Sequence, residues 1–163
     1  MLFDQHALHE RILYERLLKD YQAGSKIPSQ RLLFPIPVAI SGAEILMEQE
    51  NLLEKLGFEL RLWNDGKIQI VAAPAILKRD YSSVLTKLSE SLALPFETMA
   101  REVLSTMACH SAVRAHDRLS SSEIEQLLKD FESEDAVGHC PHGRPTFVRL
   151  QIKDLEKMFH RVV

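Results

Sequence analysis

Residues that could hold a metal ion lie near both ends of this chain. Near the start, His6 and Glu10 stand four residues apart. In a helix this spacing places both side chains on one face. Near the end, Cys140 and His142 stand two residues apart in the polar run Cys140-Pro141-His142-Gly143-Arg144-Pro145, so their side chains can converge. Two imidazoles, one thiolate and one carboxylate form a four-coordinate set suited to zinc, provided that the fold brings the two ends together.

Asp4 adds a hard oxygen donor beside this set. Together with Glu10 it could hold a Mg²⁺ or Mn²⁺ ion next to the zinc. A metal ion acidifies its bound water, and a second ion stabilises the leaving oxygen of a phosphoryl displacement, so the set predicts a hydrolytic centre with Asp4 and Glu10 as catalytic residues. Two plainer interpretations stay open: Asp4 as a helix N-cap, and His6 with Glu10 as an exposed helix face.

Three further residues are candidates for the same site. Cys109 is either a further metal ligand or an inert buried thiol on a helix. Arg144 and Arg149 lie close to the cysteine loop, and guanidinium groups bind phosphate oxygens, so the cluster favours a phosphodiester substrate. The remaining histidines are more typical of solvated or structural positions and receive no role: His9, His110, His116, His139 and His160.

Composition limits the class of protein. With 163 residues, 45% of them hydrophobic, the chain can bury a core as one compact domain or two small subdomains. No apolar run approaches the roughly 20 residues of a membrane span, and no secretory signal pattern is present. Both cysteines stand beside histidines rather than in a disulfide framework, which favours a reducing cytoplasm. The net charge of −3 argues against strong independent binding to nucleic acid.

Periodicity and turn signals predict the elements that position these residues. The tail of a strand is expected at Met1-Leu2-Phe3, as in a piece of a longer protein, and a proline-bearing edge strand over 31–41. A hairpin is expected around Asn64-Asp65-Gly66, with strands 58–63 and 67–72. A polar loop is expected over 132–145, and then a strand over 146–152. The expected helices are 4–21, 43–56 (with Gly57 as its C′ residue), 80–93, 95–115, 120–131 and 154–161.

Taken in order, these motifs resemble the C-terminal endonuclease domain of the MutL family of DNA mismatch repair proteins. Asp4-Gln5-His6-Ala7 with Glu10 and Glu15 matches the family's metal-binding helix. Its second, third and fourth motifs resemble Ala108-Cys109 followed by Ala112-Val113-Arg114-Ala115, Cys140 to Pro145, and Phe147-Val148-Arg149. One departure is His110, where the family commonly has a basic residue after the cysteine, which puts a phosphate contact from that position in doubt.

The resemblance implies a set of roles. The residues that match the family's metal ligands are His6, Glu10, Cys109, Cys140 and His142, and Asp4 matches a residue needed for nicking. Zinc would be structural or regulatory, and Mn²⁺ or Mg²⁺ catalytic. ATP would bind only the absent N-terminal half. The segment 30–35 resembles the hexapeptide that docks on the replication sliding clamp, with Gln30, Leu32, Leu33 and Pro35 as its clamp-binding residues, although its plain interpretation is an ordinary strand start.

The expected fold is α/β (α+β) with two subdomains. Residues 1–40 and 107–163 would form a sheet-based dimerisation subdomain that holds the metal site, and 41–106 an inserted regulatory subdomain. The expected partners are a second copy, duplex DNA bound weakly by this part alone, the clamp, and a mismatch-recognition protein through the full-length chain, in a bacterial cytoplasm near the nucleoid. No membrane is expected.

The sequence therefore predicts a metal-dependent endonuclease that nicks duplex DNA in mismatch repair and is stimulated by the clamp. One alternative is a non-catalytic dimerisation module in which zinc only joins the chain ends. Another is a metallohydrolase that acts on small phosphoesters.

Overall fold

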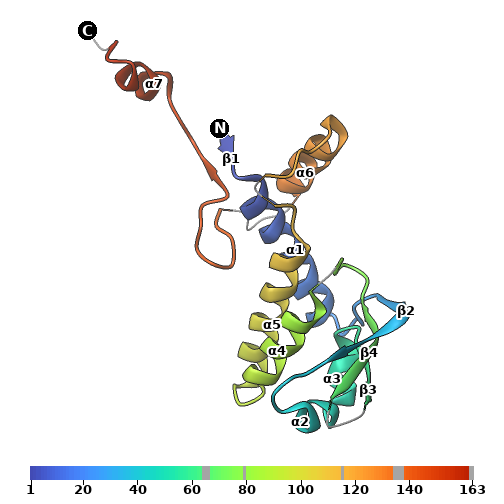
Figure 1. The fold of residues 1–163 in the computed structure, drawn as a ribbon. Coiled ribbons are helices and arrows are strands. Elements are labelled where there is room, and N and C mark those ends of the chain that lie inside the picture. The colour runs from blue at the N-terminus through green and yellow to red at the C-terminus, as the bar shows by residue number, and fades with distance from the viewer. Residues whose placement is uncertain (64–66, 79, 115, 134–137, 162–163) are drawn as a thin grey trace. The chain divides into compact units, whose positions relative to one another are not determined.

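The computed structural model describes residues 1–163 apart from 64–66, 79, 115, 134–137 and 162–163. The elements along the chain (Figure 1) are β1 (Leu2–Phe3), α1 (Gln5–Gln22), β2 (Ser29–Val38), α2 (Ala43–Met47), α3 (Glu50–Lys55), β3 (Glu59–Leu62), β4 (Ile68–Pro74), α4 (Tyr81–Ser91), α5 (Phe96–Ser111), α6 (Ser121–Ser133), β5 (Phe147–Val148) and α7 (Ile152–Met158). They form a mixed fold with two small sheets, which agrees with the expected α+β class.

The chain divides into two compact units. The first contains Met1–Ile12 with Val113–Val163, and the second contains Leu13–Ala112. These boundaries differ from the predicted ones at 40 and 107. The reason is strand pairing: β2 lies against β4, so this part of the predicted dimerisation subdomain belongs with the middle of the chain. The dimerisation and regulatory roles of the two parts stay predictions.

The second unit contains an antiparallel sheet with strand order β2-β4-β3. The central strand β4 is almost entirely buried, whereas β2 is an edge strand, as its two prolines predict. The ladder between β2 and β4 shifts register between Arg31 and Ile36. The predicted hairpin is confirmed by the antiparallel pairing of β3 with β4, and its turn at 64–66 lies outside the described residues.

Helices complete the core of this unit. The fully buried side chains include Val84, Leu85 and Leu88 of α4 and Leu104 and Met107 of α5, which lie side by side (Figure 1). The predicted helix over 43–56 is instead two short helices, α2 and α3.

Gly57 ends this helical segment as predicted, with a φ of +85°. A Cβ atom there would stand 2.9 Å from the backbone oxygen of Ile27, so only glycine fits this position. The predicted helix 95–115 ends earlier, at Ser111, because Ala112 is extended.

The first unit is closed by its two ends. β1 pairs with β5 in antiparallel register, with Leu2 opposite Val148 and Phe3 opposite Phe147. The rings of Phe3, Phe131 and Phe147 contact one another at centroid distances of 5.0, 5.5 and 5.9 Å, which anchors α6 to this pair of strands. The predicted strand over 146–152 is therefore confirmed only in its two paired residues.

Capping sets the start of the last two helices. Ser120 and Glu123 form the reciprocal bonds of a capping box at the start of α6. Gln151 and Asp154 form a second capping box, which starts α7 at Ile152, two residues before the predicted start. Among the described residues, no helix combines the length and the apolar character needed to cross a lipid bilayer.

The buried Tyr21 generates a stability prediction. Its side chain is 7% exposed, and within the described residues its hydroxyl group has no hydrogen-bond partner. Burial raises the pKa of Tyr21 above its ordinary value of 10.0. Because the substitution Tyr21→Phe removes an unsatisfied polar atom, we expect it to raise the free energy of unfolding by about 1 kcal/mol near neutral pH.

The raised pKa also predicts the pH dependence of this difference. A folded-state pKa above the unfolded value contributes stability that is present below about pH 10 and is lost as pH rises through the folded pKa. The advantage of Tyr21→Phe over the wild type should therefore widen above about pH 10. Urea unfolding of both proteins at neutral and alkaline pH measures this; a variant that is less stable than the wild type at neutral pH contradicts the assignment.

Candidate metal centre

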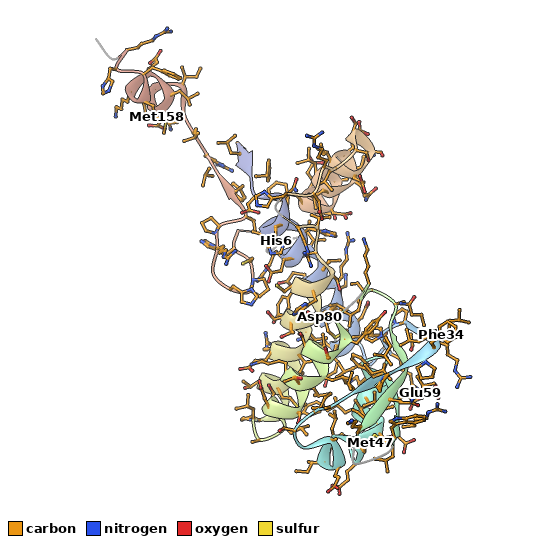
Figure 2. The ribbon with its side chains drawn as sticks, in the orientation of Figure 1. His6, Phe34, Met47, Glu59, Asp80 and Met158 are labelled. Atoms are coloured by element: carbon orange, nitrogen blue, oxygen red, sulfur yellow. The ribbon has the colours of Figure 1, made fainter. Side chains whose placement is uncertain are left out.

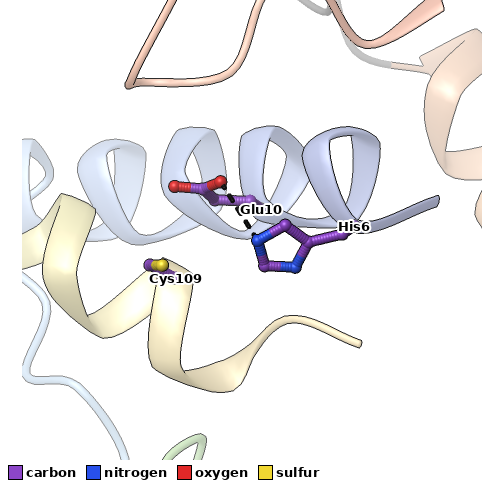
Figure 3. A group of neighbouring side chains, drawn as sticks. All are labelled: His6, Glu10 and Cys109. Carbon is purple, nitrogen blue, oxygen red and sulfur yellow. Dashed lines mark ion pairs between the residues drawn. The ribbon is translucent and has the colours of Figure 1, made fainter. Parts of the chain in front are cut away.

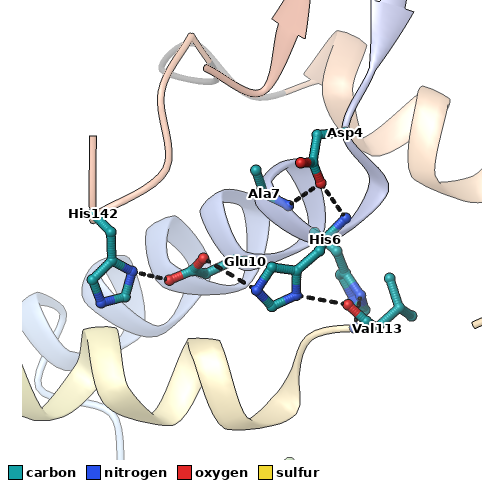
Figure 4. Close-up of polar contacts among 7 residues, drawn as sticks. Asp4, His6, Ala7, Glu10, Val113 and His142 are labelled. Atoms are coloured by element: carbon teal, nitrogen blue, oxygen red, sulfur yellow. Dashed lines mark hydrogen bonds and ion pairs between the residues drawn. The ribbon is translucent and has the colours of Figure 1, made fainter. Parts of the chain in front are cut away.

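The site begins at the N-terminus of α1, which Asp4 caps. Its Oδ1 accepts hydrogen bonds from the backbone N–H groups of His6 and Ala7, both at 3.0 Å (Figure 4). This confirms the N-cap interpretation of Asp4. The backbone N–H of Asp4 donates to the carbonyl oxygen of Thr146 at 2.9 Å, which ties the start of the helix to the segment that follows the cysteine loop.

Side chains from both ends of the chain converge in the first unit. Ligand atoms of Glu10, Cys140 and His142 all lie within 4.8 Å of one another. Glu10 and Cys140 are only 2% and 3% exposed, whereas His142 is exposed. The predicted meeting of the two ends is therefore confirmed for these three residues.

A tight turn positions Cys140 and His142. The N–H of Gly143 donates to the carbonyl of Cys140 at 2.9 Å, and the N–H of Cys140 donates to the carbonyl of Arg144 at 2.8 Å. Pro141 occupies the second position of this turn, where its fixed φ fits, and Gly143 has a φ of +81° that favours glycine. The proline and glycine of this loop thus place a thiol and an imidazole side by side.

His6 is oriented by a backbone carbonyl. Its Nδ1 lies 2.8 Å from the carbonyl oxygen of Val113 (Figure 4). A carbonyl oxygen only accepts hydrogen bonds, so Nδ1 carries a hydrogen, and in the neutral ring Nε2 then keeps its lone pair. That Nε2 lies 3.8 Å from Oε2 of Glu10 on the same helix (Figure 3). A histidine held in this way is arranged as metal-ligating histidines commonly are.

The surroundings of the Glu10 carboxylate indicate whether a metal ion fits this site. Its Oε1 lies 2.6 Å from Nδ1 of His142, but the pair lacks hydrogen-bond geometry, and this buried oxygen has no hydrogen bond among the described residues. An unsatisfied buried carboxylate oxygen is costly. A cation shared by Glu10, Cys140 and His142 would satisfy it, and this donor set suits zinc. These three residues therefore fit a zinc ion.

The site roles of three other residues, Cys109, Arg144 and Arg149, stay predictions. Cys109, labelled in Figure 3, lies in α5 and belongs to the second unit, so its role as a ligand stays a prediction. Arg144 and Arg149 are exposed in the first unit, with the Arg149 guanidinium 6.0 Å from the ring centroid of Phe147. Their contact with phosphate stays a prediction.

His110, which departs from the family pattern, has a partner that the sequence did not indicate. Its Nδ1 lies 2.8 Å from Oδ2 of Asp80. The other oxygen of this carboxylate, Oδ1, accepts a hydrogen bond from the hydroxyl group of Ser83. Asp80 has a φ of +64° and directly precedes α4 (Figure 2). The side chain at this position is thus engaged by a carboxylate within the second unit.

The segment predicted to dock on a clamp lies in the irregular part of β2. Leu33 and Phe34 are 88% and 78% exposed at the register shift. Figure 2 labels Phe34 on β2. Leu32 instead packs, partly buried, against the core, so only one of the two predicted leucines is presented to solvent. Gln30 is exposed, and its Nε2 lies 3.5 Å from the carbonyl of Leu77. Phe34 is an exposed apolar residue that sequence reasoning left out.

Comparison with known proteins shows what the chain is similar to. The family described as "MutL C terminal dimerisation domain" matches residues 1–119. The DNA mismatch repair protein MutL of Methylocella silvestris is 39% identical across 99% of this chain. The proteins of the same name from Dichelobacter nodosus and Pseudomonas fluorescens are 38% and 40% identical, again across 99% of the chain.

The chain spans only 26–28% of the length of these relatives. The likeness therefore concerns one part of those proteins, and it covers almost the whole of the present chain. Together with the match to the family itself, it shows that this chain belongs to the MutL C-terminal dimerisation domain family.

Proposed function

We propose that this chain is a metal-dependent endonuclease domain that nicks one strand of duplex DNA during mismatch repair. The observation that carries the proposal is the converging set of Glu10, Cys140 and His142, in which the buried Oε1 of Glu10 lies 2.6 Å from Nδ1 of His142 and has no hydrogen bond among the described residues. Relatives named DNA mismatch repair protein MutL support a role in mismatch repair for the proposed reaction.

The proposed zinc ligands are His6, Glu10, Cys140 and His142, with Cys109 as a further ligand by resemblance. Zinc would be structural or regulatory. A catalytic Mn²⁺ or Mg²⁺ would be held through Asp4 and Glu10 and would supply an acidified water and stabilisation of the charge on the leaving oxygen. Both cap bonds of Asp4 use Oδ1, so the carboxylate retains a second oxygen for this task.

Substrate binding would depend on exposed cations and on tethering. Arg144 and Arg149 are exposed near the turn that carries His142, where they would contact phosphate oxygens. The net charge of −3 predicts weak binding to DNA by this part alone. Docking on a sliding clamp through Gln30, Leu33 and Pro35 would raise the local concentration of the domain at DNA, as would a mismatch-recognition protein bound to the full-length chain.

Association with a second copy is supported by the surface of the first unit. Exposed apolar side chains occur in each of its terminal elements: Leu2 of β1, Val148 of β5, and Ile152, Leu155 and Met158 of α7. Soluble monomers rarely leave large apolar surface uncovered. We propose that this surface forms a homodimer, in keeping with the dimerisation domain family to which the chain belongs.

A second candidate function is a non-catalytic dimerisation module whose zinc only joins α1 to the cysteine turn. The cap bonds of Asp4 favour it, because they give that residue a structural task without any reaction. The two functions differ in whether the carboxylate charge of Asp4 is needed. Nicking by Asp4→Asn therefore distinguishes between them.

Zinc binding tests the metal centre. We expect one zinc ion per chain, bound through the four proposed residues, because two imidazoles, one thiolate and one carboxylate supply the number and kinds of ligand that zinc takes. Cys140→Ser should weaken zinc binding by at least about tenfold. His160→Asn is the matched control, since His160 is exposed and has a φ of +51° that asparagine tolerates. Metal analysis and competition with a chelator measure this; equal affinity of the wild type and Cys140→Ser contradicts the proposed set.

Nicking tests the catalytic role of Asp4. Asparagine caps helices as well as aspartate does, so Asp4→Asn should leave the melting temperature unchanged. It should lower Mn²⁺-dependent nicking of supercoiled plasmid by about 100-fold or more, because the hard anionic oxygen is lost. No turnover of an aryl phosphate is expected. Full nicking by Asp4→Asn would remove Asp4 from the reaction, and a wild type that binds zinc but never nicks, even with clamp present, would favour the non-catalytic module.

Clamp docking is tested at Leu33. Since its side chain is 88% exposed, Leu33→Ala should not alter stability, but it should weaken clamp binding by about tenfold or more. Leu62→Ala, at an exposed position on β3, is the matched control and should bind normally. Leu32→Ala should instead lower stability, because Leu32 packs against the core. Surface plasmon resonance on immobilised clamp measures the affinities; equal losses at Leu33 and Leu62 would locate the interface elsewhere.

A further inference from the structure

Two histidines of α1 hold the same residue of the first unit. Nδ1 of His6 lies 2.8 Å from the carbonyl oxygen of Val113, and the N–H of Val113 donates to Nδ1 of His9 at 3.1 Å. Both bonds join segments more than 100 residues apart in sequence. His9 is partly buried and is no member of the converging ligand group of the first unit.

We infer that His9 is a positioning residue for the metal ligand His6 and acts through Val113. The inference rests on the metal centre proposed above. His6 offers Nε2 to a metal only while its Nδ1 proton is held by the Val113 carbonyl. The direction of that carbonyl depends on the backbone of residue 113, and His9 fixes this backbone from its amide side.

The chemistry of the two bonds assigns opposite tautomers to the two rings. An amide N–H only donates, so Nδ1 of His9 must present a lone pair. A carbonyl only accepts, so Nδ1 of His6 must carry a hydrogen. The His9 bond thus requires an acceptor atom at the Nδ1 position and no ionic charge, which defines the substitutions that separate its positioning role from simple packing.

A neighbouring contact shows why His9 is needed in addition to other links. Nε2 of Gln5 donates to the carbonyl oxygens of Arg114 at 2.9 Å and Asp117 at 2.8 Å. These bonds hold the backbone that follows the Val113 carbonyl in sequence, whereas His9 holds the N–H that precedes it. The peptide that carries the Val113 carbonyl is also held at its other end, because the N–H of Arg114 donates to Oδ2 of Asp117 at 2.8 Å. The His9 bond instead fixes the preceding peptide through the N–H of Val113, and it thereby sets how residue 113 is placed against His6.

The test compares two substitutions that differ in the acceptor. His9→Asn places a carbonyl oxygen close to the position of Nδ1, whereas His9→Phe keeps a ring of similar size without an acceptor. In the metal-free protein, long-range nitrogen NMR of the imidazole rings should show His6 as the Nδ1–H tautomer in the wild type and in His9→Asn. In His9→Phe it should show a mixture of tautomers.

Zinc affinity gives a second measurement. We expect His9→Phe to bind zinc about tenfold more weakly than the wild type, and His9→Asn to bind within about threefold of it. If His9→Phe does not fold, His9→Asn alone tests the inference. This variant keeps the acceptor, so the inference is overturned if it loses the Nδ1–H tautomer of His6 together with its zinc affinity. A pure Nδ1–H tautomer of His6 in folded His9→Phe also overturns it. Absence of zinc binding by the wild type would refute the proposed metal centre and would leave the tautomer measurement as an independent result.

Discussion

The proposed metal centre depends on the antiparallel pairing of β1 with β5. This short ladder, extended by the hydrogen bond from Asp4 to Thr146, brings the start of α1 beside the cysteine turn. Only then does the carboxylate of Glu10 meet Cys140 and His142. Two paired residues on each strand would be marginal alone, and the contacts among Phe3, Phe131 and Phe147 supply the apolar burial that holds them.

Local signals predicted the parts of the site that depend on local geometry. The helical spacing of His6 and Glu10 and the cap at Asp4 are each fixed within a few positions of the chain, and the structure confirms them. The same holds for the hairpin of β3 and β4. These predictions succeeded because they depend on short-range chemistry, which tertiary packing did not override.

Long-range contacts were less predictable. The predicted domain boundaries did not anticipate the pairing of β2 with β4, because nothing in residues 29–38 indicates which strand lies beside them. The partners of His9 and His110 were missed for the same reason: a backbone amide and Asp80 have no fixed spacing from a histidine. Leu32 and Leu33 alternate in direction, and the register shift decides which of them the strand exposes.

The split origin of the ligands has a consequence for biosynthesis. A ribosome completes α1 long before it adds the turn that contains Cys140, so the emerging polypeptide carries an imidazole and a carboxylate but no closed coordination shell. Such a pair binds zinc far less well than a full set of four ligands. With the zinc site that we propose, nascent chains that stall or terminate early would lack the ion, and any hydrolytic capacity linked to it would arise only in polypeptides synthesised beyond the last ligand.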